Sequence, residues 1–217
     1  MKQEDKSDST KERILNEAEA LFAEKGFHAV SVREISTAAE CNLAAMNYHF
    51  GHKQDLYLEV FRARWVPRAK RMQACFRASL PTQAPPSPTA VAQALAEAFI
   101  VGPLSDEERQ RHHQLMAREL AQPTEAFELL AQQVIRPFFK ELADLFRLFM
   151  PEGLDEERLM LNILSIFAMV LYFNFARVAV SRITGRKYDS SFKARLVEHI
   201  MEFSLKGLDV DEKEGTR

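Results

Sequence analysis

The residues most able to carry catalysis or hold a metal ion form no reactive pattern in this sequence. His112 and His113 are adjacent, so on a helix their side chains point in different directions and make a poor metal pair. Cys41 and Cys75 fit neither a disulfide framework nor a metal site, and we expect reduced thiols in a cytoplasmic protein. The sequence has no phosphate-binding loop and no nucleophile elbow. We therefore expect neither an enzyme nor a cofactor, and no metal-ion site.

Two polar residues in an otherwise apolar segment are better candidates for binding chemistry. Residues 159–180 form the most apolar stretch of the chain, and Asn174 and Arg177 interrupt it three positions apart. Residues at this spacing are neighbours on one face of a helix. They could orient a ligand or satisfy each other across a dimer interface. The polar interruptions also favour a buried helix over a membrane span.

The composition indicates that helices position these residues. Of the 217 residues, 47% are hydrophobic and 28% are charged, and only seven are glycine. Ala, Leu, Glu and Arg dominate the long segments, which favours an all-α fold. The formal net charge of −2 means that any basic surface for nucleic acid must be local. The polar start of the chain, residues 1–9, lacks the features of a signal peptide.

Residues that start and stop helices predict three compact helices near the N-terminus. These signals are the capping boxes Ser9/Glu12 and Ser31/Glu34, the hydrophobic staple Val30/Ile35, the N-cap Asn42, and the stops Gly26 and Gly51. A three-residue turn separates the second helix from the third, which is typical of a helix-turn-helix unit. Periodicity alone would fit equally well a small three-helix scaffold that has no role in DNA binding.

The remainder of the chain also predicts helices. A long helix extends from Gln54 toward Ala78 and is bent at Pro67, because proline lacks the N–H that a helix needs. A proline-rich loop follows over residues 81–88. The later helical segments are expected at about 89–101, 105–121, 124–149, 155–184 and 189–206, with a kink at Pro137. We see no strand pattern and no internal repeat.

Residues 10–57 resemble the DNA-binding domain of the TetR family of repressors. The resemblance is carried by residues 10–15, 18–26, 31–35 and 42–53, the last of which reads Asn-Leu-Ala-Ala-Met-Asn-Tyr-His-Phe-Gly-His-Lys. The order of the caps, the aromatic residues near the end of the third helix, and Lys53 three residues after Phe50 all match. Two positions depart from the family: Glu40 stands where many relatives have a turn glycine, and His52 replaces a serine cap.

The sequence is also similar to the CecR-like (YbiH-like) subgroup of this family. The matching features are Arg118-Glu119-Leu120 with Pro123-Thr124, then Ile135-Arg136-Pro137, and the apolar helix ending in Ala176-Arg177. The resemblance implies a homodimer that binds a near-palindromic operator in double-stranded DNA, usually as a repressor, and is released by a small-molecule effector. It implies a helix-turn-helix DNA-binding domain over residues 1–56 and a helical ligand-sensing and dimerisation domain over 57–208. The charged composition of residues 209–217 predicts a disordered tail.

The resemblance further implies which residues contact DNA. The third helix would lie in the major groove, where base patterns can be distinguished. The implied contacts to bases and backbone are Ser31, Arg33, Asn42, Leu43, Ala45, Asn47, Tyr48, His49 and Lys53. Asn47 would pair with adenine and Ala45 would contact a thymine methyl group. We expect Ala44, Met46 and Phe50 to be packing residues, Asn42 could serve only as a cap, and Tyr48 could equally be a core aromatic residue.

The charge of this segment limits the expected affinity for DNA. Residues 1–56 hold seven Lys and Arg against ten Asp and Glu, a net charge of −3. Six basic residues follow within 57–77, on a helix that could face away from DNA. We expect modest non-specific affinity and a weak dependence on salt, because few phosphates would be neutralised.

The second domain supplies candidates for effector binding and dimerisation. The expected effector-binding residues, suited to an apolar or drug-like compound, are Phe99, Met116, Phe138, Phe139, Phe167, Phe173, Asn174 and Arg177. The aromatic residues could instead be ordinary core. We expect residues 155–184 and 189–206 to pair with their symmetry mates in a four-helix bundle. An alternative function is a dimeric helical ligand-binding or interaction protein without operator-specific binding.

Overall fold

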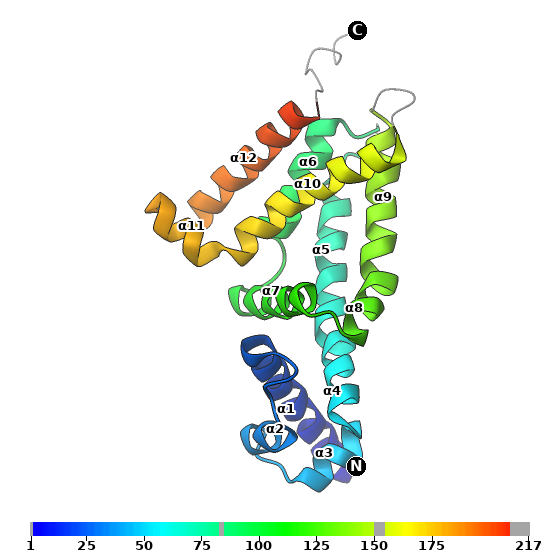
Figure 1. The fold of residues 1–217 in the computed structure, drawn as a ribbon, viewed down its shortest axis with the longest axis vertical. Helices are drawn as coiled ribbons and strands as arrows, with labels where there is room; N and C mark the ends of the chain where they lie inside the picture. Colours follow the sequence, from blue (N-terminus) through cyan, green and yellow to red (C-terminus); the bar gives the residue numbers. More distant parts are fainter. Residues whose placement is uncertain (1, 83–84, 150–154, 209–217) are drawn as a thin grey trace. The chain divides into compact units, whose positions relative to one another are not determined.

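The computed structural model describes residues 2–82, 85–149 and 155–208, and every regular element within them is helical (Figure 1). This confirms the all-α prediction. The expected disordered tail, residues 209–217, lies outside the described residues. The α-helices are α1 (Lys2–Lys25), α2 (Val32–Ala38), α3 (Leu43–Phe50), α4 (Lys53–Val60), α5 (Val66–Ser79), α6 (Pro88–Ala96), α7 (Asp106–Ala121), α8 (Glu125–Leu130), α9 (Arg136–Arg147), α10 (Glu156–Phe175), α11 (Arg177–Thr184) and α12 (Ser190–Gly207).

The chain forms two compact units that interleave along the sequence. The first unit contains residues 1–69 and 105–134, and the second contains residues 70–104 and 135–217. In the first unit, α7 packs on α1 and α8 packs on α4. The first unit therefore combines the helix-turn-helix segment with α4, α7 and α8, whereas the sequence prediction divides the chain once, after residue 56.

The beginning of α1 differs from the prediction. The helix starts at Lys2 and continues through Ser9, so the predicted capping box of Ser9 and Glu12 is wrong. The residues that precede Ser9 include no glycine or proline, and nothing local stops the helix from extending toward the N-terminus. The predicted stop at Gly26 is confirmed, because Gly26 has a φ of +82° and its N–H donates to the Phe22 carbonyl at 2.9 Å.

The capping signals of the next two helices are confirmed. The Glu34 N–H donates to Ser31 Oγ at 3.1 Å, and the Ser31 N–H donates to the Glu34 carboxylate at 3.4 Å. The Ala45 N–H donates to Asn42 Oδ1 at 2.7 Å. These contacts satisfy N–H groups that have no partner within the helix. The start of each helix, and hence the rotation of its faces, is fixed locally.

Three π-helical turns occur along the longer helical segments, and each ends two residues before a proline. They are η1 (Phe61–Trp65) before Pro67, η2 (Glu97–Val101) before Pro103, and η3 (Ala131–Ile135) before Pro137. Proline has no N–H, and its ring collides with the carbonyl four residues earlier, so the preceding turn widens. In η1 the Val66 N–H donates to the Phe61 carbonyl. The irregularities expected at Pro67 and Pro137 are therefore present as wide turns.

The predicted single helix over 155–184 is wrong at Ala176, which has φ −93° and ψ 20° and separates α10 from α11. The Tyr188 hydroxyl donates to the Phe173 carbonyl at 2.5 Å and takes the acceptor that a continuing helix would use. The buried Asn174 amide donates to the Val170 carbonyl at 3.0 Å and to the Phe99 carbonyl at 3.2 Å. Side chains that bond backbone carbonyls in this way compete with the helix.

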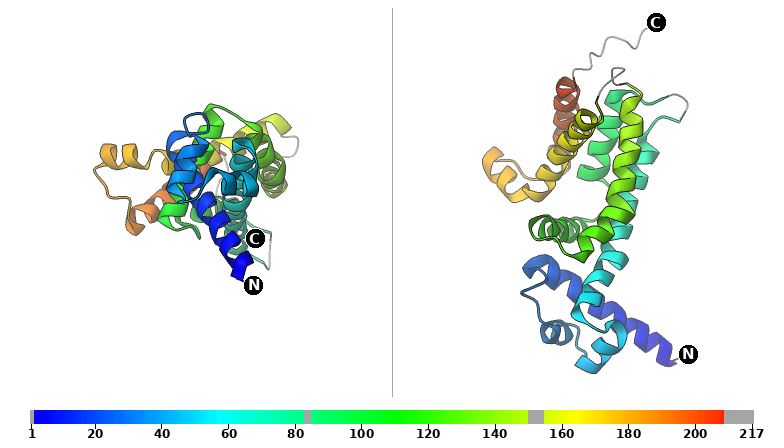
Figure 2. Two further views of the ribbon diagram at one scale, coloured as in Figure 1. Left: turned by 90° about the horizontal axis from the view of Figure 1, so that it is seen from below. Right: turned by 45° about the vertical axis from the view of Figure 1, so that its right-hand side comes forward.

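Aromatic and aliphatic side chains from seven helical elements form the core of the second unit. Phe138 lies with its ring centroid 5.5 Å from that of Phe76 and 5.8 Å from that of Phe99. The core continues through α10 and α12, and α12 packs most extensively on α6. Figure 2 shows α11 standing away from α5, α6 and α9 in both views. The helices α10, α11 and α12 thus form one side of this unit.

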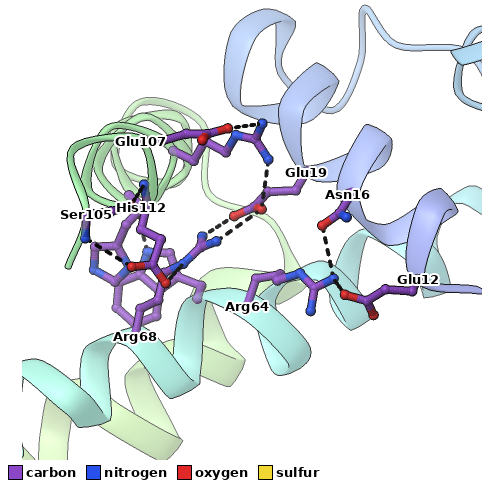
Figure 3. A network of polar contacts seen from close by, with 11 residues as sticks. Glu12, Asn16, Glu19, Arg64, Arg68, Ser105, Glu107 and His112 are labelled. Carbon is purple, nitrogen blue, oxygen red and sulfur yellow. Dashed lines mark hydrogen bonds and ion pairs between the residues drawn. The ribbon is translucent and has the colours of Figure 1, made fainter. Parts of the chain in front are cut away.

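A buried ion pair joins three helices of the first unit (Figure 3). Glu19 on α1 is only 1% exposed, and its carboxylate accepts two hydrogen bonds from Arg68 on α5. Arg111 on α7 donates to the same carboxylate at 3.4 Å. A buried carboxylate is tolerated only when it is paired in this way. The pair therefore fixes α1 relative to α5 and α7.

Two further buried contacts lie in the same unit. The Trp65 indole N–H donates to the His112 carbonyl at 3.1 Å, and the two rings stack with centroids 4.3 Å apart. Burial lowers the pKa of His112 well below its ordinary value, so this side chain stays neutral. The Tyr57 hydroxyl donates to Glu119 at 2.6 Å, and burial raises the pKa of Tyr57.

Replacing Arg68 with methionine tests the contribution of the ion pair. The change would leave the Glu19 carboxylate with one weaker partner in a buried place, and we expect a loss of about 3 kcal/mol in the free energy of unfolding. The measurement is urea unfolding followed by far-UV circular dichroism. The matched control is Arg62→Met, which removes an exposed arginine 3.9 Å from Glu59 and should change stability by less than about 0.5 kcal/mol. Equal stabilities for the two variants would contradict the assignment.

Candidate DNA-binding site

The helix α3 presents one exposed face and one buried face. Asn47 and Tyr48 are exposed, Tyr48 with 83% of its surface open, while Met46 and Phe50 are buried. The exposure of Tyr48 shows that it is not a core aromatic residue. The expectation that Met46 and Phe50 pack inside is confirmed. The same expectation for Ala44 is wrong, because Ala44 lies on the exposed face.

The helix α3 is held by its buried residues and by both of its ends. It packs on α1, α2 and α4. Asn42 caps its start, and Gly51 ends it with a φ of +70°. A backbone in this conformation is open to glycine at little cost. The outward face is therefore presented on a short helix whose rotation is fixed.

The remaining residues predicted to contact DNA lie on α3 itself or on other segments of the same unit. Ser31 and Arg33 are exposed at the start of α2, whereas His49 and Lys53 are half-buried. The Lys53 ammonium group lies 4.3 Å from the centroid of the Phe27 ring, and desolvation lowers the pKa of Lys53. Its ammonium group thus lies over an aromatic ring while the residue remains partly open to solvent.

Several charges around the helix-turn-helix are paired within the protein. Lys25 and Glu34 form an ion pair at 2.6 Å, and Arg64 on η1 pairs with Glu12. Arg68 is taken up by the buried Glu19. Two of the basic residues that follow the segment 1–56 thus neutralise carboxylates of α1. They offer no free charge to DNA, and the weak salt dependence stays a prediction.

Comparison with known proteins decides the family. Residues 14–60 match the family described as bacterial regulatory proteins, tetR family. Residues 88–208, more than half of the chain, match the C-terminal domain of the HTH-type transcriptional dual regulator CecR. The chain belongs to the TetR family of transcriptional regulators. Its second half has the CecR type of C-terminal domain. Because its N-terminal part matches the bacterial regulatory proteins of the tetR family, this TetR-family protein is a DNA-binding regulator.

Individual relatives agree with this assignment. The HTH-type transcriptional dual regulator CecR of Shigella flexneri is 27% identical over 191 residues, which cover 83% of this chain and 82% of CecR. The probable HTH-type transcriptional regulator YttP of Bacillus subtilis (strain 168) is 46% identical over 48 residues, 22% of this chain and 23% of YttP. This second match has the higher identity and is confined to a short stretch of both proteins.

Solved structures of regulators share the fold. A TetR-like transcriptional regulator from Rhodococcus sp. RHA1 has a TM-score of 0.66 at 13% identity and covers 93% of this chain and 97% of its own. The fatty acid degradation regulator FadR from Bacillus halodurans has a TM-score of 0.61 at 18% identity, covering 92% of this chain and 96% of its own. These similarities concern the fold of the TetR-family chain.

The structure brings together only some of the residues predicted to bind an effector. The Phe167 ring centroid lies 5.1 Å from that of Phe99 and 5.2 Å from that of Phe139, and Phe138 packs beside them. These rings fill space against one another as core residues do. Phe173 is half-buried near the end of α10. Met116 is buried in the first unit and does not belong to this aromatic group.

The predicted neighbours Asn174 and Arg177 do not share a helix face. The break at Ala176 places Asn174 at the end of α10 and Arg177 at the start of α11. The Asn174 amide is used by backbone carbonyls, and Arg177 lies 4.7 Å from the centroid of the Tyr188 ring. The expectation that their spacing makes them adjacent on one face is therefore wrong.

Sequence reasoning missed a cleft of about 640 Å³ in the second unit. We name it the α12 cleft, and among its lining residues are Cys75, Glu97, Val101, Ala194, Glu198 and Met201. The residues on α12 follow helical spacing, which was a detectable signal. Because the remaining walls come from α5, α6 and η2, no single stretch of sequence reveals the cleft.

The turn before α3 holds a strained residue, because Glu40 has a φ of +49°. For a residue other than glycine, a backbone with this positive φ costs about 1 kcal/mol. We expect Glu40→Gly to stabilise the protein by about that amount, measured as the free energy of unfolding in urea. The matched control, Glu17→Gly within α1, removes the same charge and should destabilise by about 1 kcal/mol. A loss of stability in Glu40→Gly would show that the turn does not strain this residue.

Proposed function

We propose that this TetR-family regulator is a homodimeric repressor that binds a near-palindromic operator and releases it when a small-molecule effector binds. The observation that carries the proposal is the exposed face of α3, in which Asn47 and Tyr48 project to solvent. A short helix that exposes polar and aromatic groups on one face, while its opposite face is buried in the protein, fits the major groove.

The outward residues of α3 would read bases. Asn47 carries the amide that pairs with adenine N6 and N7, Ala45 offers a methyl group to thymine, and Leu43 would contact a base edge. The residues that surround this face would bind the DNA backbone. They are Ser31, Arg33, Asn42, Tyr48, His49 and Lys53. Phosphate contacts of this kind set the position of the helix without reading sequence.

A dimer would use the apolar surface of α10, α11 and α12. Large hydrophobic side chains on these helices are exposed in the single chain, and they are Leu161, Leu164, Tyr172, Phe175, Val178, Ile183 and Phe203. Only 28% of the most apolar window of α10 is buried. By length and composition alone, this helix could cross a membrane. A contiguous apolar surface of this extent on one side of a unit is typical of a subunit interface.

An effector would act through helices that connect its site to α3. The helix α5 lines the α12 cleft, and the chain continues without a loop from α4 through η1 into α5. A compound that displaces α5 would move α4, which packs directly against α3. Because two half-sites must be met at once, small displacements in both copies would reduce operator affinity.

Selection of bound sequences from random duplex DNA tests operator recognition. We expect a near-palindromic consensus, and we expect Asn47→Ala to weaken binding to it by about tenfold to a hundredfold, since one bidentate base contact is lost. Fluorescence anisotropy with labelled operator measures this. Gln133→Ala removes an exposed amide on η3, outside the helix-turn-helix, and should leave affinity unchanged. Selection that yields no consensus would favour a dimeric ligand-binding protein without operator specificity.

Charge placed on the apolar surface tests the dimer. Phe203 on α12 is 58% exposed in the single chain, and Phe203→Asp would bury an unpaired carboxylate in the proposed interface. We expect the dimer dissociation constant to rise at least about a hundredfold, measured by sedimentation velocity over a concentration series. Leu148→Asp is the matched control, because Leu148 is 61% exposed but lies beyond α9. Equal dissociation constants for the two variants would place the interface elsewhere.

A further inference from the structure

The α12 cleft has the size of a small-molecule site. Its volume is about 640 Å³, within the range of about 300 to 1,000 Å³ that is typical of ligand pockets. Three helical elements surround it: α5, the segment from α6 into η2, and α12. A compound seated here would contact parts of the chain that are far apart in sequence.

The charged groups of the cleft all have one sign. Glu97 on η2 and Glu198 on α12 line it, and no lysine or arginine is among the lining residues. The Glu97 carboxylate accepts a hydrogen bond from the Gln93 amide at 2.9 Å, and in the described part of the chain neither glutamate forms an ion pair. Two carboxylates without a counter-charge favour a positively charged occupant.

The helix backbone adds to this negative potential. The turn η2 ends at the cleft, where Val101 and Gly102 form part of the wall. The C-terminal end of a helix carries a partial negative charge, because its carbonyl dipoles point outward there. This contribution comes from the backbone and is independent of the two glutamates.

Most of the remaining wall of the cleft is apolar, with Ser79 and Gln93 as the other polar side chains. Val101 is 48% exposed, and Ala194, Val197 and Met201 line α12 on the same side. Methionine is flexible and fits ligands of varied shape. The cleft thus combines an apolar surface that would bury rings or alkyl groups with carboxylates at its edge.

We propose that the α12 cleft binds an amphipathic monocation, an organic compound with an apolar body and one positively charged centre. The cation would lie near Glu97 and Glu198, and the apolar body would lie against Val101 and Met201. The assignment rests on the proposed function in one respect, that this cleft is the effector site of the regulator. It narrows the expected effector, an apolar or drug-like compound, to one that carries a positive charge.

Two probes of nearly identical shape and opposite charge test the charge class directly. Tetraphenylphosphonium is a monocation, and tetraphenylborate is its anionic counterpart. We expect isothermal titration calorimetry of the full chain to show saturable binding of the cation, one per chain, and binding of the anion at least about tenfold weaker. Equal affinity for both probes, or no binding of the cation, would overturn the proposal.

Amide substitutions locate the binding site. We expect the double variant Glu97→Gln/Glu198→Gln to bind tetraphenylphosphonium about tenfold more weakly than the parent protein. Glu202→Gln makes the same chemical change at an exposed position of α12 that does not line the cleft, and it should alter the affinity by less than about twofold. A double variant that binds as tightly as Glu202→Gln would place the cation elsewhere.

The chain carries its own reporter, because Cys75 lines the cleft and Cys41 does not. In a Cys41→Ser background, saturating tetraphenylphosphonium should slow the reaction of Cys75 with Ellman's reagent at least about fivefold. In a Cys75→Ser background, the cation should not change the rate at which Cys41, whose pKa is raised by burial, reacts with the same reagent. Unchanged labelling of Cys75 would contradict occupancy of the cleft.

Operator binding, measured on the unmodified protein, separates this inference from the proposed function. Cation binding in the cleft together with operator affinity that does not depend on the cation would support the site and reject effector-controlled release by this ligand class. Operator binding without any binding of the cation would reject the site and leave the DNA-binding function standing.

Discussion

The buried pair between Glu19 and Arg68 is the contact on which the DNA-binding surface depends. A carboxylate that is 1% exposed cannot remain charged without partners at hydrogen-bonding distance. The helix α1 carries this carboxylate, and α2 and α3 pack on α1. The outward face of α3 therefore depends on a residue of α5 that lies twelve positions beyond the predicted end of the first domain. Contacts of this kind explain why the compact units interleave along the chain.

Local signals in the sequence predicted local structure well. Ser31 and Asn42 were identified as caps because each side chain bonds an N–H only three residues away, and Gly26 and Gly51 were identified as stops because of their backbone freedom. Ser9 has the same spacing relative to Glu12, but a cap also requires that the preceding chain is not helical. The break at Ala176 could not be foreseen, because the hydroxyl that bonds the Phe173 carbonyl belongs to Tyr188, outside α10 and α11.

The two candidate sites differ in how far sequence could reveal them. The face of α3 follows from the periodicity of one short helix and from the family resemblance, so the exposure of Asn47 was predictable, whereas the sequence left open whether Tyr48 is exposed or buried. The α12 cleft is assembled from three separate segments, and an inventory of aromatic residues pointed instead to Phe99 and Phe167. Those rings contact each other, and composition cannot distinguish rings that line a cavity from rings that fill one.

In the proposed arrangement, the helix α12 would link ligand binding to dimerisation through two different faces. Ala194, Glu198 and Met201 face the cleft, while His199 and Phe203 lie beside α10 on the surface proposed for the dimer. Coupling between sites in regulators is typically about 1 to 3 kcal/mol, or a fivefold to 150-fold change in affinity. The cation would supply a coupling free energy of this size if it bound Glu97 and Glu198 more tightly in one arrangement of α5 and α12 than in the other. The π-helical turn η1 lies between α4 and α5, and such turns frequently occur at functional sites in helices. In this proposal, α12 joins the cleft to the dimer surface, and the chain that runs without a loop from α4 through η1 into α5 would carry a displacement toward α3.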